Sequence, residues 1–327
     1  MTGPFRYTSP ELPGSAAGVV AGVYEQLATD FGIDRAPTFV VLSAAPDLLA
    51  AAWALLRESL LTGQAPRTGK EVAAAGVSLV NRCPFCVAAH TMLLHATGDH
   101  RLAETIARGD LPDDPGHRRL LAWGKDMSTP RPFPAAQAPE YIGTALAFHF
   151  INRIVSSLLT EDTLPGGAQR YRLVRSVAGR SLARTVRRRL VPGESLALLE
   201  TAGTAPGWAA DTPAGTAFGA LRAAAHRGAE LLGDEDSALV RASVAAWDGV
   251  APLPLHGEGL PDRAERPGAR LALLAARAPY RITDEDVAAW RGPSVTDDRL
   301  VRLIAFGAVC AVERVEATLP TRTEEHA

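Results

Sequence analysis

Residues 68–95 read TGKEVAAAGVSLVNRCPFCVAAHTMLLH and bring a carboxylate, two thiols and an imidazole into twenty residues. These side chains, in the spacing E-x11-C-x2-C-x3-H, belong to Glu71, Cys83, Cys86 and His90. Apolar residues recur around them at intervals of three and four, which is the period of amphipathic helices. The stretch therefore predicts two helices that meet at the CxxC. In a reducing compartment such a pair of cysteines indicates redox or metal chemistry.

The spacing suggests how the four side chains work together. Cys83 lies at the expected start of a helix, where unpaired N–H groups and the helix dipole favour a thiolate, and Pro84 suits the first turn. His90 follows Cys86 by four residues, so the imidazole shares a helix face with that sulfur and can exchange a proton with it. Glu71, on the preceding helix, would meet His90 if the helices run antiparallel, and its carboxylate would orient the ring.

Simpler explanations exist for the same residues. Glu71 follows Thr68 in the T-x-x-E pattern of a capping box, which would also fix the position of the carboxylate. The two thiols could be inert, or could bind zinc with His90, but a structural zinc site needs a fourth ligand. His95 is the nearest candidate, and its five-residue offset turns it away from His90. Because all four residue types coincide, we predict redox-active thiols and no metal.

The predicted chemistry needs a second thiol compound. A thiolate attacks the O–O bond of a peroxide or a disulfide sulfur, and the neighbouring thiol resolves the product into a Cys83–Cys86 disulfide. A separate dithiol must then reduce this disulfide. The sequence contains no flavin or nicotinamide motif, so we expect no cofactor.

The bulk properties are those of an ordinary globular protein. Of 327 residues, 47% are hydrophobic and 21% are charged. The net charge of −2 argues against a protein that binds nucleic acids or anionic membranes in general. No stretch approaches twenty uninterrupted apolar residues, and the first residues lack a basic start followed by an apolar segment. We therefore expect a cytoplasmic protein.

The helical period continues through most of the chain without a convincing strand pattern, so we predict an all-α fold. Residues 1–43 form a Pro- and Gly-rich arm, and residues 44–165 form a redox domain around the CxxC. An Arg-rich connecting helix is expected over 166–192. Residues 193–327 are expected to form a second helical domain, and Cys310 lies there in an apolar run typical of a buried, inert thiol.

The second half looks like a worn copy of the first, which suggests a tandem repeat whose C-terminal copy is degenerate. Residues 300–319 resemble the long helix expected over 141–159, and residues 267–287 resemble 115–135. The segment that takes the place of the CxxC helices contains no cysteine.

Three further residues are candidates for lining a substrate pocket. His149 and Asn152 are polar groups inside the apolar pattern of the long helix, and Phe85 lies between the cysteines. The alternative for His149 and Asn152 is that they form hydrogen bonds between packed helices or at an oligomer seam. Phe85 would in either case belong to the core or to a pocket wall.

The pattern Glu71–Cys83–Cys86–His90 resembles the signature of the alkylhydroperoxidase AhpD-like branch of the carboxymuconolactone decarboxylase superfamily. The segments VSLVNRCPFCVAAHTMLL and AFHFINRIVSSL are similar to that family's core helices. The length and the worn second half resemble a two-repeat subgroup of the family.

This resemblance implies an AhpD-like helical bundle that forms homo-oligomers, and a peroxidase or thiol–disulfide oxidoreductase activity. Cys86 would be the peroxidatic thiol and Cys83 the resolving thiol, which meets the reductant. His90 and Glu71 would form a proton relay through a water molecule. The family's best-known reductant is a lipoyl-bearing protein. Pro84–Phe85 replaces a pair that contains an additional histidine in AhpD.

Two other functions stay open at this point. The dithiol could belong to a non-catalytic redox sensor or scaffold, in which oxidation switches assembly. Alternatively, the fold could be recruited to another reaction on a small metabolite and retain the acid–base pair.

Overall fold

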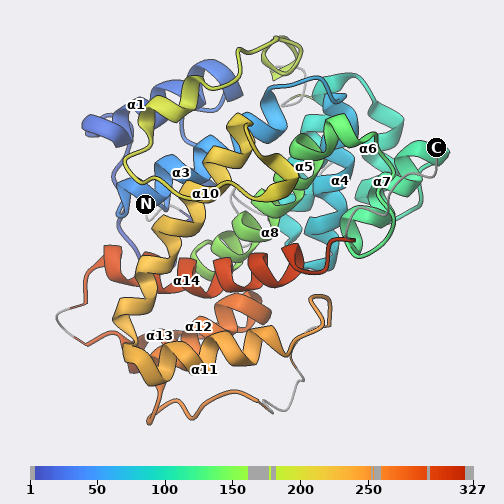
Figure 1. The fold of residues 1–327 in the computed structure, drawn as a ribbon. Helices are drawn as coiled ribbons and strands as arrows, with labels where there is room; N and C mark the ends of the chain where they lie inside the picture. The colour runs from blue at the N-terminus through green and yellow to red at the C-terminus, as the bar shows by residue number, and fades with distance from the viewer. Residues whose placement is uncertain are drawn as a thin grey trace.

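The computed structural model describes residues 4–160, 177, 182–251, 253, 259–292 and 295–320. In this part of the chain the regular structure is helical, and the only strand-like pairing is an isolated antiparallel bridge between Phe5 and Leu159. The prediction of an all-α fold is confirmed (Figure 1). No helix among the described residues is long and apolar enough to cross a membrane.

The N-terminal segment contains α1 (Gly18–Gln26), the π-helical turn η1 (Leu27–Phe31) and the short helix α2 (Pro37–Val40). α1 packs against α3, and Val23 and Leu27 are fully buried. Before α1 the chain connects distant elements. The Arg6 amide donates to the Leu158 carbonyl over 2.9 Å, and the Tyr7 hydroxyl donates to Asp284 over 2.9 Å. The first residues therefore join the end of one half of the chain to the other half.

The first half contains α3 (Pro46–Leu56), the π-helical turn η2 (Arg57–Leu61), α4 (Arg67–Val80), α5 (Pro84–Thr97), α6 (His100–Ala107), α7 (Pro115–Lys125), η3 (Ala135–Gln137) and α8 (Ala138–Leu158). α4 packs against α5, α7 and α8. The contact with α7 is close, because a Cβ atom on Gly76 would lie 2.5 Å from the Leu121 carbonyl oxygen and one on Gly124 would lie 2.2 Å from that of Ala73. α8 is buried along nearly its whole length.

Local signals place the two helices at the CxxC. Cys83 is the N-cap of α5, Pro84 occupies its first turn, and Gly98 ends it in the left-handed conformation with φ of 103°. The alternative explanation of Glu71 as part of a capping box is wrong, because α4 begins at Arg67 with no side-chain cap. The Thr68 hydroxyl instead donates to Asp99 over 3.0 Å.

The second half contains η5 (Glu194–Leu198), η6 (Gly207–Ala209), α10 (Pro213–His226), η7 (Arg227–Leu231), α11 (Gly233–Ala245), α12 (Pro267–Arg277), η8 (Pro279–Arg281), α13 (Asp284–Trp290) and α14 (Asp297–Glu316). α12 packs on α14 as α4 packs on α8. A Cβ atom on Gly307 would lie 2.1 Å from the Ala272 carbonyl oxygen, so this contact is also close. The segment that follows α12 reads RAPYR, and the one that follows α4 reads RCPFC.

The two halves share one hydrophobic core. α10 packs against α3 and α14 packs against α8, so that in Figure 1 α14 lies between α8 and the helices α11, α12 and α13. Buried side chains from Val20 to Val315 belong to one continuous cluster. Cys310 is buried in it, as expected. Most of the predicted Arg-rich helix over 166–192 lies outside the described residues, which include only Val177 and 182–192 of that range.

An ion-pair cluster around Asp47 also joins the halves. This carboxylate, at the start of α3, accepts hydrogen bonds from Arg302 over 2.8 Å and from Arg227 over 2.9 Å. Burial opposes its ionisation, but the hydrogen bond and charge of Arg302 and the charge of Arg227 together hold the pKa of Asp47 below its usual value.

We expect Asp47→Asn to lower the free energy of unfolding by about 2 kcal/mol at pH 7, because two guanidinium groups lose their charged acceptor. A depressed folded-state pKa means that this contribution is present above the unfolded value, near pH 3.9, and is lost as the pH falls through the folded value. The difference between wild type and variant should therefore shrink below about pH 4 in urea denaturation curves. A difference unchanged at pH 3 would contradict this explanation.

Candidate active site

The two cysteines lie at the junction between α4 and α5. Their sulfur atoms are 2.8 Å apart, and both residues are at least 97% buried. Arg82, just before Cys83, has a φ of 54°, in the left-handed region that non-glycine residues rarely adopt. This conformation turns the chain sharply between the helices and so fixes Cys83 at the first turn of α5. The predicted CxxC geometry, with both sulfurs within reach of each other, is present.

Glu71 and His90 are in contact. His90 Nδ1 lies 2.7 Å from Glu71 Oε2, and both side chains are buried. Arg67, one turn earlier on α4, donates from Nε to Glu71 Oε1 over 2.7 Å. The His90 ring also packs edge-on against Phe148 of α8, with 4.2 Å between the ring centroids. The carboxylate thus holds the imidazole on one side and a guanidinium group on the other.

The second nitrogen of His90 is the available one. Nε2 is buried and has no hydrogen-bond partner among the described residues. The Cys86 sulfur makes its hydrogen bond with Cys83, so the imidazole and the Cys86 thiol are not directly bonded. A proton that moves between them needs an intervening molecule, such as the water of a relay.

The pKa values of Glu71 and Cys86 are shifted in opposite directions. Burial opposes ionisation of Glu71, but Arg67 and His90 outweigh it and hold the pKa of that carboxyl below its ordinary value. Burial raises the pKa of Cys86 well above the usual thiol value, and the hydrogen bond and charge of Cys83 add to this effect. At rest the site therefore combines an ionised carboxylate with a protonated Cys86 thiol.

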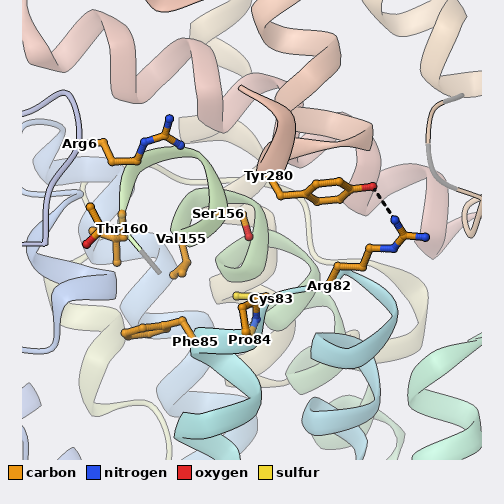
Figure 2. Close-up of a pocket in the computed structure, with 10 residues that line it drawn as sticks. Arg6, Arg82, Cys83, Pro84, Phe85, Val155, Ser156, Thr160 and Tyr280 are labelled. Atoms are coloured by element: carbon orange, nitrogen blue, oxygen red, sulfur yellow. Dashed lines mark hydrogen bonds between the residues drawn. The ribbon is translucent and has the colours of Figure 1, made fainter. Parts of the chain in front are cut away.

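A cavity of about 290 Å³ opens beside Cys83 (Figure 2). Its walls come from the N-terminal segment, the CxxC turn, the end of α8 and η8, and they include Arg6, Arg82, Cys83, Phe85, Ser156 and Tyr280. Figure 2 shows Tyr280 opposite the cysteine turn, with Arg82 donating to its hydroxyl over 3.4 Å. Of the two cysteines, Cys83 alone is among the lining residues of this cavity, together with Arg6 and Arg82.

The three predicted pocket residues lie in different surroundings. Phe85 lines the cavity, whereas His149 and Asn152 are buried on α8 and are not among its lining residues. His149 Nδ1 lies 3.2 Å from Asn81 Nδ2, and burial together with the charge of Arg153 lowers the pKa of His149 well below its usual value. Asn152 Oδ1 accepts from the Ser78 hydroxyl over 3.3 Å, which is a contact between packed helices.

Sequence reasoning missed several residues around the thiols. Arg67 precedes Glu71 by four residues on a helix, and this spacing could have predicted their ion pair. Arg82 is adjacent to the CxxC. Tyr280 and Arg6 come from distant parts of the chain, and no local pattern connects them with the cysteines.

His95 does not face the thiols. Its Nδ1 lies 2.9 Å from His100 Nδ1, and its Nε2 lies 2.8 Å from Glu104 Oε1. In the described part of the chain no group of three or more His, Cys, Asp or Glu side chains is arranged to hold a metal ion.

Comparison with known proteins gives two matches. The model of the carboxymuconolactone decarboxylase family matches residues 46–111, which include α4, the CxxC turn and α5. The chain is also 40% identical to a protein of Mycobacterium tuberculosis named alkyl hydroperoxide reductase, over 94% of this chain and 93% of that protein. No solved structure matches the chain.

Proposed function

The chain belongs to the carboxymuconolactone decarboxylase family, and on this premise we propose that it is an oxidoreductase that reduces a peroxide with electrons from a dithiol. The observation that carries the proposal is the pair of sulfur atoms 2.8 Å apart at the start of α5, the helix that also bears His90, whose ring contacts Glu71 of α4. The name of the mycobacterial relative supports a peroxide as the oxidising substrate.

The proposed reaction has three steps. The Cys86 thiolate attacks one oxygen of ROOH, the O–O bond breaks, and ROH leaves with a proton, so that Cys86 becomes a sulfenic acid. Cys83 then attacks the Cys86 sulfur, water leaves, and a Cys83–Cys86 disulfide forms. An external dithiol reduces this disulfide through a mixed disulfide and is itself oxidised to a disulfide. In sum, ROOH and a dithiol give ROH, water and a disulfide.

The relay of His90 and Glu71 takes the proton from Cys86 and so produces the thiolate. Because burial raises the pKa of Cys86, a base must take its proton when the peroxide arrives. His90 Nε2 is buried without a partner, and Glu71 stabilises the imidazolium ion that forms when this nitrogen accepts a proton. The transferred proton then leaves with the alcohol product.

The cavity beside Cys83 is the proposed entry for the reductant. The thiol that lines it is the one that an incoming dithiol would attack, and we place the dithiol of a lipoyl-type arm in this cavity of about 290 Å³. Arg6 and Arg82 at its walls would favour an acidic partner surface. Assembly into a homo-oligomer remains a prediction from the family resemblance.

We expect the purified protein to consume an organic hydroperoxide in the presence of dihydrolipoamide. The double variant Cys83→Ser/Cys86→Ser should show only the uncatalysed rate, because both sulfur atoms are needed for turnover. Peroxide loss and dithiol oxidation should be measured together and should agree one to one.

Cys310→Ala provides the control. Burial raises the pKa of this third thiol to about 12, so it does not ionise at neutral pH and its loss should leave turnover unchanged. If oxidation joined the two thiols and altered the oligomer size without turnover, the redox-sensor alternative would replace the peroxidase.

A further inference from the structure

A second cavity, of about 450 Å³, lies at the start of α4 and shares no lining residue with the cavity beside Cys83. It is enclosed by the loop that follows η2, by the first turn of α4, by the end of α5 and by the segment Val186–Pro192. We propose that this cavity binds a small polyanion that carries phosphate or carboxylate groups.

The walls of the cavity are positively charged. Arg187, Arg188 and Arg189 line the cavity in succession and are exposed, and no carboxylate side chain is among its lining residues. Arg187 and Arg189 form no ion pair with a described residue, and Arg188 makes one long hydrogen bond, of 3.4 Å, to the Thr29 carbonyl. Three adjacent guanidinium groups repel one another, so a bound anion would relieve that repulsion.

A fourth guanidinium group faces the cavity from α4. Arg67 donates from Nε to Glu71, but its Nη2 atom is buried and has no hydrogen-bond partner. A buried N–H donor without an acceptor is costly, and an oxygen atom of a ligand would satisfy it.

The remaining charges nearby are already matched. Lys70 donates to Glu140 over 2.8 Å and to two carbonyl groups, so its ammonium group has its partners within the protein. Asp99 accepts from the Thr68 hydroxyl over 3.0 Å, and Glu140 also accepts from the Gln64 and Ala65 amides over 2.8 and 2.9 Å. Among the described residues that line the cavity, the cations without a carboxylate partner are therefore Arg187, Arg188 and Arg189.

A buried ion-pair network holds that wall in place. Arg57 is fully buried in η2 and donates from Nη1 to the Val191 carbonyl over 3.0 Å. The neighbouring Glu58 accepts from the Gly193 amide over 2.7 Å and from the Ser195 hydroxyl over 2.6 Å. The segment that carries the arginine residues is thus attached to η2 from inside the core, which preorganises the cavity for a ligand.

An anion bound in this cavity would also affect the thiol site. Arg67 is bonded to Glu71, and Glu71 is bonded to His90, so an anion that attracts the Arg67 guanidinium group would alter the carboxylate that orients the imidazole. This coupling rests on the proposed function, whereas the binding itself does not.

The test is isothermal titration calorimetry on the full-length, reduced protein at low ionic strength, with inorganic pyrophosphate and citrate as separate probes. We expect saturable 1:1 binding of at least one probe, and the stronger probe tells phosphate from carboxylate recognition. The double variant Arg187→Gln/Arg189→Gln should weaken binding by about tenfold or more, because two charge-assisted hydrogen bonds are lost.

The matched control is Arg101→Gln/Arg108→Gln, which removes two exposed arginine side chains of the α6 region that already pair with Asp113 and Asp110. It should leave affinity within about twofold, since it changes the net charge equally but lies away from the cavity. Equal weakening in both double variants, or no binding by the wild type, would overturn the proposal. Cys83→Ser/Cys86→Ser should bind as the wild type does, so a failure of the proposed peroxidase activity would be distinguishable.

Discussion

Cys86→Ser is expected to abolish the reaction with peroxide, by at least about 10³-fold, because the attacking sulfur atom is removed. Cys83→Ser is expected to stop steady-state turnover but to retain one round of peroxide reduction, which leaves a sulfenic acid on Cys86. The measurement is a single-turnover reaction with one equivalent of hydroperoxide, followed by trapping with a sulfenate-specific 1,3-diketone and mass spectrometry of the labelled peptide.

The two thiols lie in different environments. Cys83 caps α5, where the helix dipole favours a thiolate, and it lines the cavity. Cys86 is the thiol whose pKa is raised by burial, and it depends on the relay for its ionisation. A label on Cys83 in the Cys86→Ser variant would reverse the assigned roles while leaving dithiol chemistry intact.

Glu71→Gln is expected to slow peroxide reduction by about 10²–10⁴-fold, which is the usual contribution of a positioned acid–base group. The amide keeps the shape of the side chain but cannot stabilise an imidazolium ion at His90. Because Arg67 and His90 hold the pKa of Glu71 below its usual value, the wild-type carboxylate stays ionised above about pH 4.3. The rate loss should therefore be nearly constant across neutral pH in stopped-flow measurements of thiol oxidation.

Glu104→Gln offers a matched control on a second buried histidine. Glu104 lies 2.8 Å from Nε2 of His95, whereas Glu71 contacts Nδ1 of His90, and the His95 pair does not face the thiols. Its substitution should alter stability without slowing peroxide reduction. Equal loss of rate in the two variants would show that Glu71 acts through folding alone.

Local patterns predicted the parts of the structure that depend on local physics. The start and end of α5 follow from Pro84 and Gly98, whose backbone preferences suit the first turn and the left-handed cap. The long helix α8 follows from its apolar period. Even so, Thr68 does not cap α4, because the helix begins one residue earlier and its hydroxyl bonds to Asp99.

Contacts between distant segments of the chain could not be predicted from the sequence. The cavity beside Cys83 takes Tyr280 and Arg6 from positions on either side of the CxxC, and only the packing of η8 on α8 and the path of the N-terminal segment bring them there. His149 illustrates the same point, because a polar residue in an apolar helix reads equally as a pocket residue or as a packing contact. Tertiary structure alone separates these readings.

The cavity beside Cys83 is built from three regions of a single chain: the N-terminal segment, the first half and the turn after α12. Since peptide bonds link these regions, their effective concentration toward one another is set by the chain and not by the amount of protein present. A cavity formed between separate subunits would come apart on dilution. This one persists in every molecule, however scarce the protein is.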